Sequence, residues 1–400
     1  MKIGLFLGKQ SIKGGGLFTY TIGLLKVLIN TREIDNIVLY YSKLQSRYLN
    51  NYFKNSKVIP VLVNDHTKWW KICRTISKVF SKIYSVLPHQ YEIIMKLSLL
   101  FNPYNRIINS NRIDIFHVPF QFSPIYGIKI PVIVTMHDFQ ELHYPEFFTS
   151  SDRRARAVGF KKSIDKSNHI IVSFNHVKQD ILRYFEVENN KITVFPLPFA
   201  EDWFSTSVYT SKKELEEKYD LPEEYILYPA ATWKHKNHTN LIKAISYLKG
   251  NGKSVFLVCT GNKTEFFEQI EKEIINCDLK SEVKFLGIVP EEDLIGLYHY
   301  TKLVVVPTLY EAGSGPLFEA MRYNVPVICS NVTSLPESIN NEEFVFNPNS
   351  IKDIAKLIEK GCFDKEYIKR NIDNSKKRME YYKNQNYKNI YFSVYKNIIK

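Results

Sequence analysis

The sequence predicts an α/β protein with two doubly wound domains, each built around a parallel sheet. Short apolar runs rich in Val and Ile alternate with amphipathic segments of helical period, which is typical of βα units. This rhythm fills both halves of the 400 residues, a length that ordinarily forms roughly two or three domains. Between the halves, residues 191–200 carry two prolines, which cannot continue a helix. We therefore expect a hinge there and a domain boundary near residue 200.

The elements follow from this pattern in chain order. In residues 1–200, the apolar runs expected to be strands are Ile3–Leu7, Asn36–Tyr41, Lys57–Val63, Ile113–Val118, Val132–Met136 and His169–Ser173. In residues 201–375, the expected strands are Tyr225–Pro229, Ser254–Cys259, Val283–Leu286, Leu303–Pro307 and Pro326–Cys329. Residues 376–400 have a helical pattern with several aromatic side chains. This terminal helix could cross back to the N-terminal domain.

Composition excludes several classes of protein. With 44% hydrophobic residues the chain can bury a large core, so disorder is not expected. The five cysteines are scattered and include no C-x-x-C pair, which argues against a disulfide framework or a structural zinc site and favours a reducing cytosol. No run approaches the roughly 20 apolar residues of a membrane span, and the N-terminus resembles a strand more than a signal peptide. We expect a cytoplasmic protein.

The positive charge lies almost entirely in the first half. Residues 1–200 contain 27 Lys+Arg and 13 Asp+Glu, whereas residues 201–400 contain 27 and 28. Such asymmetry indicates an anionic partner for the first domain, either a membrane surface or a nucleic acid. No nucleic-acid-binding motif accompanies the charge, so we expect no nucleic-acid partner.

One segment, Trp69–Leu87, has the pattern of a basic amphipathic helix. At 100° per residue its apolar side chains fall on one face, and Lys71, Arg74, Lys78 and Lys82 fall on the opposite face. Such a helix can lie in an anionic membrane interface. It can equally pack its apolar stripe on the domain core and leave the basic face in solvent. The sequence leaves both alternatives open, with a peripheral position on the inner face of the cell membrane as the first.

The motif E-A-G-S-G-P-L-F-E at residues 311–319 indicates an anion site. It follows an apolar strand and enters a helix at Pro316, so that backbone N–H groups at the helix start point toward a ligand such as a phosphate. A carboxylate beside a phosphate is electrostatically unfavourable, so we expect Glu311 and Glu319 to accept hydrogen bonds from nearby sugar hydroxyls. The alternative is an ordinary helix start with two solvated acids.

Three motifs in order resemble one known family. After Glu311 and Glu319 come Ala-Met and N-V-P-V-I-C-S-N; upstream lie V-K-F-L-G-I-V-P at 283–290 and Y-P-A-A-T-W-K-H-K-N-H at 228–238. Together they resemble the retaining glycosyltransferases of the GT-B fold, in the glycogen-synthase-like family four. The resemblance implies two Rossmann-like domains that face a central cleft. The N-terminal domain would bind the acceptor, and the C-terminal domain would bind a nucleotide sugar.

The resemblance also implies roles for residues of the second domain. Glu319 would accept hydrogen bonds from the ribose hydroxyls and Glu311 from the transferred sugar. Lys236, with His235 beside it, would stabilise the leaving phosphate. No D-x-D motif is present, so we expect neither a metal nor any cofactor besides the GDP- or UDP-linked sugar substrate. The backbone N–H groups that would face the diphosphate or sugar are those of Gly313, Ser314 and Gly315.

In the first domain, ligands of open α/β sheets bind at the carboxyl ends of strands. His117 and His137 lie near two such ends. His137 followed by Asp138 resembles a pair that the family carries at the cleft, where it would touch the donor sugar or orient the acceptor. For His117 an acceptor contact and a structural role are both open. Gly15 and Gly16, in the glycine run after the first strand, are further donor-site candidates.

The predicted function is transfer of a hexose, with mannose as the first choice, from a nucleoside diphosphate sugar. The acceptor would be a saccharide or lipid-linked saccharide in lipopolysaccharide or capsule polysaccharide synthesis. By resemblance, transfer would retain configuration. The alternative is a non-catalytic GT-B protein that binds sugar nucleotides as a scaffold or partner subunit.

Overall fold

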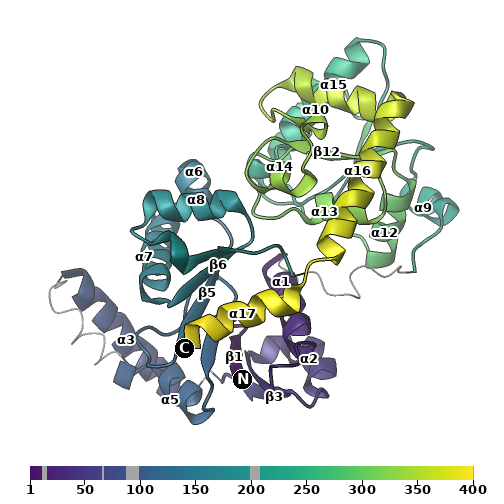
Figure 1. The fold of residues 1–400 in the computed structure, drawn as a ribbon. Helices are drawn as coiled ribbons and strands as arrows, with labels where there is room; N and C mark the ends of the chain where they lie inside the picture. The colour runs from purple at the N-terminus through teal and green to yellow at the C-terminus, as the bar shows by residue number, and fades with distance from the viewer. Residues whose placement is uncertain (11–15, 65–66, 87–98, 199–207, 400) are drawn as a thin grey trace. The chain divides into compact units, whose positions relative to one another are not determined.

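The computed structural model describes residues 1–10, 16–64, 67–86, 99–198 and 208–399. The chain divides into two compact units. Unit 1 comprises Met1–Ala200 together with Asn386–Lys400, and unit 2 comprises Glu201–Gln385 (Figure 1). Among the described residues, no helix has both the length and the apolar character needed to cross a bilayer.

Unit 1 contains a seven-stranded sheet in the order β3-β2-β1-β4-β5-β6-β7, with every pairing parallel. Its strands are β1 (Lys2–Phe6), β2 (Asn36–Tyr41), β3 (Val58–Leu62), β4 (Ile115–Val118), β5 (Val132–Met136), β6 (His169–Val172) and β7 (Ile192–Val194). The helices are α1 (Gly16–Ile29), α2 (Ser46–Phe53), α3 (Lys68–Val86), α5 (Pro103–Ser110), α6 (Gln140–His143), α7 (Ser150–Lys166), α8 (Asn175–Tyr184) and α17 (Tyr387–Ile399). The predicted α/β class is confirmed. β7, however, occupies the start of the segment that we expected to be only a hinge.

The central strands β1, β4, β5 and β6 of unit 1 are buried on both faces. Along β1, Ile3 and Leu5 belong to an apolar cluster that also includes residues of α1 and α17. Phe6 belongs to a second cluster, which includes residues of α5, α7 and α8. Helices on both sides explain why these strands are near-continuous apolar runs rather than alternating ones.

The C-terminal helix α17 completes the core of unit 1. Tyr387, Tyr391 and Tyr395 recur every four residues, so they lie on one helix face, and all three are buried. The expected terminal helix over 376–400 is two helices. Residues 376–383 continue α16 (Lys365–Lys383) of unit 2, and the chain rejoins unit 1 only at Asn386. The break falls at residues 384–386, which precede α17.

Unit 2 contains a six-stranded parallel sheet in the order β10-β9-β8-β11-β12-β13. Its strands are β8 (Ile226–Pro229), β9 (Leu257–Thr260), β10 (Val283–Phe285), β11 (Leu303–Val306), β12 (Val327–Ser330) and β13 (Val345–Phe346). Its other helices are α9 (Lys212–Tyr219), α10 (His238–Gly250), α11 (Phe267–Asn276), α12 (Glu291–Tyr300), α13 (Gly315–Arg322), α14 (Ser334–Ile339) and α15 (Ile351–Phe363). The sequence pattern did not predict β13 because two residues are too few to show a period.

Both sheets reverse their direction of growth at one point. The chain builds outward from β1 to β3 and then returns to place β4 beside β1; in unit 2 it returns to place β11 beside β8. Loops that leave adjacent strands in opposite directions open a crevice at their carboxyl ends, where ligands of such folds bind. In unit 2 this point lies between the loops after β8 and β11.

Candidate active site

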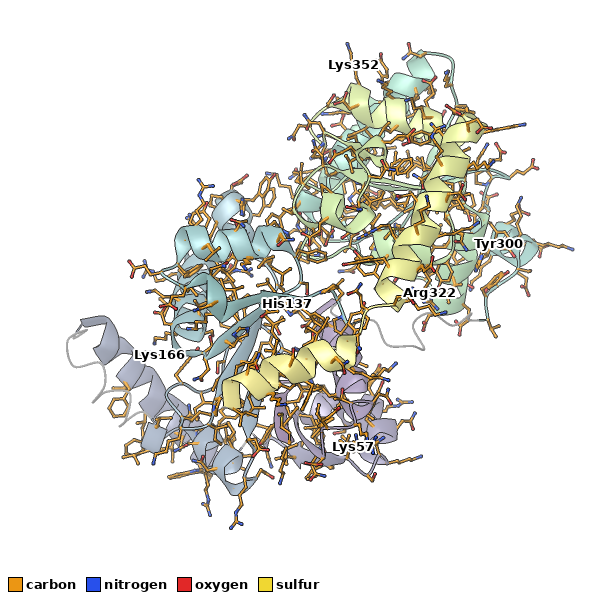
Figure 2. The ribbon with its side chains drawn as sticks, in the orientation of Figure 1. Lys57, His137, Lys166, Tyr300, Arg322 and Lys352 are labelled. Atoms are coloured by element: carbon orange, nitrogen blue, oxygen red, sulfur yellow. The ribbon has the colours of Figure 1, made fainter. Side chains whose placement is uncertain are left out.

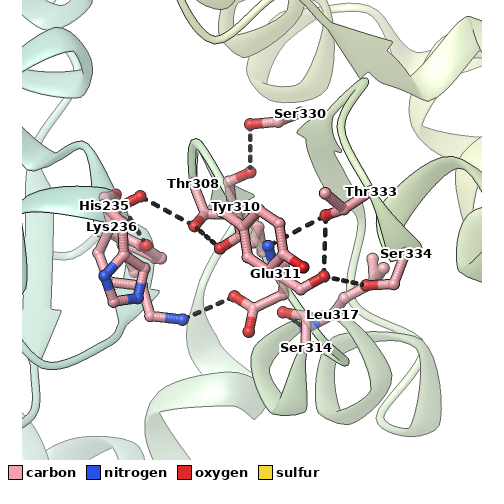
Figure 3. Close-up of polar contacts among 12 residues, drawn as sticks. His235, Lys236, Thr308, Tyr310, Glu311, Ser314, Leu317, Ser330, Thr333 and Ser334 are labelled. Carbon is pink, nitrogen blue, oxygen red and sulfur yellow. Dashed lines mark hydrogen bonds and ion pairs between the residues drawn. The ribbon is translucent and has the colours of Figure 1, made fainter. Parts of the chain in front are cut away.

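Two side chains predicted to act in the site meet at the reversal point of unit 2. Lys236 lies after β8 and Glu311 after β11, 75 positions apart in the chain. The Lys236 Nζ atom lies 2.6 Å from Glu311 Oε2, and the side chains are only 18% and 12% exposed (Figure 3). They meet because β8 and β11 are neighbours in the sheet. The ammonium and the carboxylate therefore neutralise each other where a ligand is expected.

The turn that carries Lys236 is held from both sides. Asn237 adopts a left-handed conformation with φ 60°, and its Nδ2 donates to the Pro307 and Pro348 carbonyls at 2.9 Å each. The His235 carbonyl accepts from the Leu309 N–H at 2.8 Å. Burial and the neighbouring Lys236 charge lower the pKa of His235 to about 3. His235 is thus a neutral imidazole beside the cation.

The loop after β12 holds the main chain of Glu311, which the sequence did not indicate. Thr333 Oγ1 accepts from the Glu311 N–H at 3.0 Å and donates to its carbonyl at 2.8 Å (Figure 3). Ser334 Oγ donates to the same carbonyl at 3.0 Å. Position after a predicted strand was the one available signal for these two residues.

The start of α13 offers fewer donors than its glycines indicate. Ser314 is the N-cap: its hydroxyl accepts from the Leu317 N–H at 3.3 Å and is buried. Pro316 has no N–H to offer. In the first turn this leaves the Gly315 N–H, together with the loop amides of Gly313 and Ser314, to face a ligand. Because the Ser314 hydroxyl caps the helix, the group of Ser314 that could serve the expected role is its backbone N–H, as the sequence predicted.

Glu319 lies on α13 itself, about one turn after Gly315. Its Oε2 accepts a hydrogen bond from the Tyr298 hydroxyl at 2.7 Å, and its Oε1 is 3.9 Å from the position a Cβ would take at Gly315. Burial raises the pKa of Glu319, against the lowering effects of Tyr298 and Arg322. Tyr298, itself fully buried, was not predicted as a site residue, yet it fixes one carboxylate oxygen.

In unit 1, His137 follows β5 directly (Figure 2). Its Nε2 lies 3.0 Å from the Pro119 carbonyl. A carbonyl only accepts, so Nε2 carries the proton and Nδ1 keeps the lone pair of the neutral ring. Burial lowers the pKa of His137, which favours this neutral form. The ring also meets the Tyr20 ring edge-on, with centroids 4.7 Å apart.

The two acceptor-side candidates have other partners. His117 is fully buried within β4; its Nδ1 lies 2.7 Å from the Tyr395 hydroxyl and its Nε2 3.0 Å from Thr135 Oγ1. Both ring nitrogens are therefore engaged, which favours the structural role for His117. Asp138 Oδ1 accepts from Arg156 Nη2 at 2.6 Å, and Arg156 Nε also donates to Glu141 at 2.8 Å. Asp138 thus points into an ion-pair network of unit 1.

The last two donor-site candidates are Gly15 and Gly16. Gly15 lies outside the described residues, and Gly16 is the exposed first residue of α1 with no atom within 4 Å of an added Cβ. No space restriction explains a glycine at position 16. Within the described ranges, no three His, Cys, Asp or Glu side chains gather as metal ligands.

Two family models match the chain: "Glycosyl transferases group 1" over residues 211–378 and "Glycosyltransferase Family 4" over residues 78–202. Together the two matches take in well over half of the chain and follow the division into units. The chain belongs to the GT-B glycosyltransferases.

Relatives of this GT-B family member include proteins named as mannosyltransferases. It is 24% identical to the O-antigen chain mannosyltransferase RfbU of Salmonella typhimurium, over 92% of this chain and 95% of the relative. It is 29% identical to the serotype-specific mannosyltransferase WbdA of Escherichia coli over 51% of this chain, but it spans only 26% of that relative's length.

Solved structures share its fold. A glycosyltransferase from Rickettsia africae superposes with a TM-score of 0.64 at 16% identity, covering 100% of this chain and 98% of that one. WaaG, a glycosyltransferase involved in lipopolysaccharide biosynthesis, superposes with a TM-score of 0.66 at 14% identity, covering 99% of each chain. At such identities the likeness establishes the fold alone.

Proposed function

We propose that this protein transfers a hexose, with mannose as the first choice, from a GDP- or UDP-linked sugar to a saccharide or lipid-linked saccharide. The pathway would be synthesis of O-antigen lipopolysaccharide or capsule. The observation that carries the proposal is the Lys236–Glu311 pair at the reversal point of unit 2, beside the amides of residues 313–315. The mannosyltransferase relatives support the choice of sugar.

In the proposed reaction each residue has a chemical task. The bond between C1 of the sugar and the phosphate oxygen breaks, and the acceptor hydroxyl oxygen forms the new bond to C1. Lys236 stabilises the negative charge that develops on the departing phosphate. Glu311 and Glu319 accept hydrogen bonds from hydroxyls of the sugar and the ribose. We assign the neutral Nδ1 of His137 the role of accepting a hydrogen bond from a sugar or acceptor hydroxyl.

We further propose that transfer retains configuration without a metal ion or a protein nucleophile. The acceptor would attack from the face that the phosphate leaves, and the acceptor proton would pass to a phosphate oxygen. This route requires no second carboxylate on the opposite face, unlike the route of retaining glycosidases.

An anionic membrane surface is the second proposed partner, and α3 supports it. Trp69, Ile72 and Val79 are 61%, 53% and 51% exposed, although Cys73 on the same helix is buried. The apolar stripe therefore only partly packs on the core. Exposed Lys68 and Lys71 lie on the same helix, and apolar and basic side chains together suit an anionic interface. Leu87, the end of the expected segment, lies outside the described residues.

The test is release of nucleoside diphosphate from GDP-, UDP-, ADP- and TDP-sugars in the presence of EDTA. We expect slow release from one donor by the wild type, and loss of that release in Glu319→Ala. Glu217→Ala, an exposed glutamate of α9, is the matched control and should behave as the wild type. Donor binding without release, even with saccharide acceptors added, would favour the scaffold alternative. Absence of binding to every donor would contradict the proposal.

A further inference from the structure

Thr333 has a backbone conformation that is unusual for its residue type. Its φ is 49° and its ψ is −116°. Most other non-glycine residues with positive φ in the described chain are Asn or Asp, which tolerate the left-handed region. A β-branched residue at positive φ is a genuine outlier. Such strain persists only where surrounding contacts over-determine it, and it concentrates at functional sites.

The side-chain hydrogen bonds of Thr333 both go to one residue, Glu311. Its hydroxyl bonds both main-chain groups of Glu311, accepting from the N–H at 3.0 Å and donating to the carbonyl at 2.8 Å. A hydroxyl can donate and accept at once, which a glycine or an aliphatic residue at this position could not do. Ser334 adds a bond to the same carbonyl at 3.0 Å. The strained residue and its successor thus form a clamp on Glu311.

The clamp determines where the Glu311 carboxylate lies. Residues 311–313 form no helix or strand, because they connect the end of β11 to the cap of α13 at Ser314. The Thr308 hydroxyl ties the loop at the Tyr310 carbonyl at 2.8 Å, but it does not reach Glu311. The bonds from Thr333 and Ser334 supply the restraint at Glu311 itself. With its backbone so held, Glu311 directs Oε2 to Lys236 Nζ at 2.6 Å.

We infer that Thr333 is a positioning residue for sugar transfer, which keeps the Glu311 carboxylate in its working place through the strained β12–α14 loop. Thr333 itself need not touch the substrate. The inference rests on the proposed function in one respect, namely that Glu311 contacts the donor sugar. A misplacement of about 1 Å in such a group can lower turnover by as much as about 10²-fold.

The test compares glycine and serine at position 333. Thr333→Gly removes the hydroxyl and also relieves the strained φ, so the melting temperature should not fall although kcat falls by about 10- to 10²-fold. Thr333→Ser keeps the hydroxyl and should retain kcat within about threefold of the wild type. Asn340→Gly, which relieves another positive φ at the exposed end of α14, is the matched control and should leave kcat unchanged.

A second readout does not depend on activity. Hydrogen exchange of the Glu311 amide should become about tenfold faster in Thr333→Gly, because its bond to Oγ1 is lost, but not in Thr333→Ser or Asn340→Gly. Unchanged exchange in Thr333→Gly would overturn the clamp, and wild-type kcat in that variant would overturn the positioning role. Equal loss of kcat in the glycine and serine variants would overturn the role of the hydroxyl. A wild type that transfers no sugar would defeat the proposed function, while the exchange result would still decide the clamp.

Discussion

Lys236 and Glu311 both carry a charge that the fold largely removes from water. Each is largely shielded from solvent, and a shielded charge is costly unless it is paired. Without a donor, the two side chains satisfy each other. A bound nucleotide sugar would offer the ammonium a phosphate and the carboxylate a hydroxyl, so that both charges keep a partner in each state.

The proposed role of Lys236 predicts a change in turnover when this side chain is removed. Lys236→Ala should lower kcat by a factor of about 10²–10³, since a preorganised donor at developing negative charge contributes on this order. The comparison is Lys234→Ala, an exposed lysine of the same turn, η6 (Lys234–Lys236), for which we expect near wild-type turnover. If both variants turned over donor equally, Lys236 would have no part in the chemistry.

At the scale of elements, α17 links the end of the chain to the first sheet. The Tyr391 hydroxyl lies 2.9 Å from that of Tyr20 on α1, and Tyr395 reaches His117 on β4. Burial lowers the pKa of His117 to about 3, so this histidine is neutral in the fold and needs partners for both nitrogens. The helix thus supplies a polar contact to the core that a purely apolar helix could not.

Removing this contact should destabilise unit 1 although the change lies at the far end of the chain. Tyr395→Phe deprives the His117 ring of a buried partner, so we expect a loss of about 1–3 kcal/mol in the free energy of unfolding. Urea unfolding monitored on unit 1 measures it. Lys396→Ala, on the exposed face of the same helix, should change that free energy by less than about 0.5 kcal/mol. Equal effects of the two substitutions would show that the hydroxyl contact contributes nothing.

The proposed membrane contact of α3 can be tested by vesicle binding. Replacing Trp69, Ile72 and Val79 together by Ser should weaken binding to vesicles containing phosphatidylglycerol by more than about tenfold, because three exposed apolar side chains can no longer enter the interface. Leu44→Ser with Tyr48→Ser removes two other exposed apolar side chains of unit 1 and is the control. Unaltered vesicle binding in the triple variant would return α3 to a purely structural role.

At the scale of the whole molecule, buried histidines make stability depend on pH. Burial lowers the pKa of His117, His235 and His238 to about 3 and that of His176 to about 4. In the unfolded chain these groups titrate near 6.5. Between the two values the unfolded state binds more protons, so stability is fully present above about pH 6.5 and is lost as the pH falls below it.

We therefore expect the free energy of unfolding to decrease steadily from pH 7 to pH 5, by up to about 1.4 kcal/mol per pH unit for each such histidine. Glu141, Asp180 and Glu319, whose pKa values are raised by burial, act in the opposite sense just above their usual pKa values. His238→Phe should reduce the slope of the unfolding free energy against pH by the contribution of one histidine, up to about 1.4 kcal/mol per pH unit. This holds whatever the effect of the substitution on stability at pH 7. A slope identical to that of the wild type would contradict the neutral, buried state of His238.

The sequence alone determined the fold class, nearly all of the strands and the positions of the three motifs. Hydrophobic period and composition are local properties, so each βα unit can be recognised from its own residues alone. The same locality explains the misses. β7 and β13, of three and two residues, are too short to show a period, and the break between α16 and α17 carries no strong signal.

Only the tertiary structure decided which side chains meet. Lys236 reaches Glu311 because strand order places β8 beside β11, and Thr333 reaches Glu311 from the loop after the next strand, β12. For His117, near a strand end, the sequence left an acceptor contact and a structural role both open; its partner Tyr395, which favours the structural role, comes from 278 residues away. Contacts of this kind join residues that are far apart in the sequence. They depend on strand order and on how the helices pack, and the local pattern of one element contains no information about either.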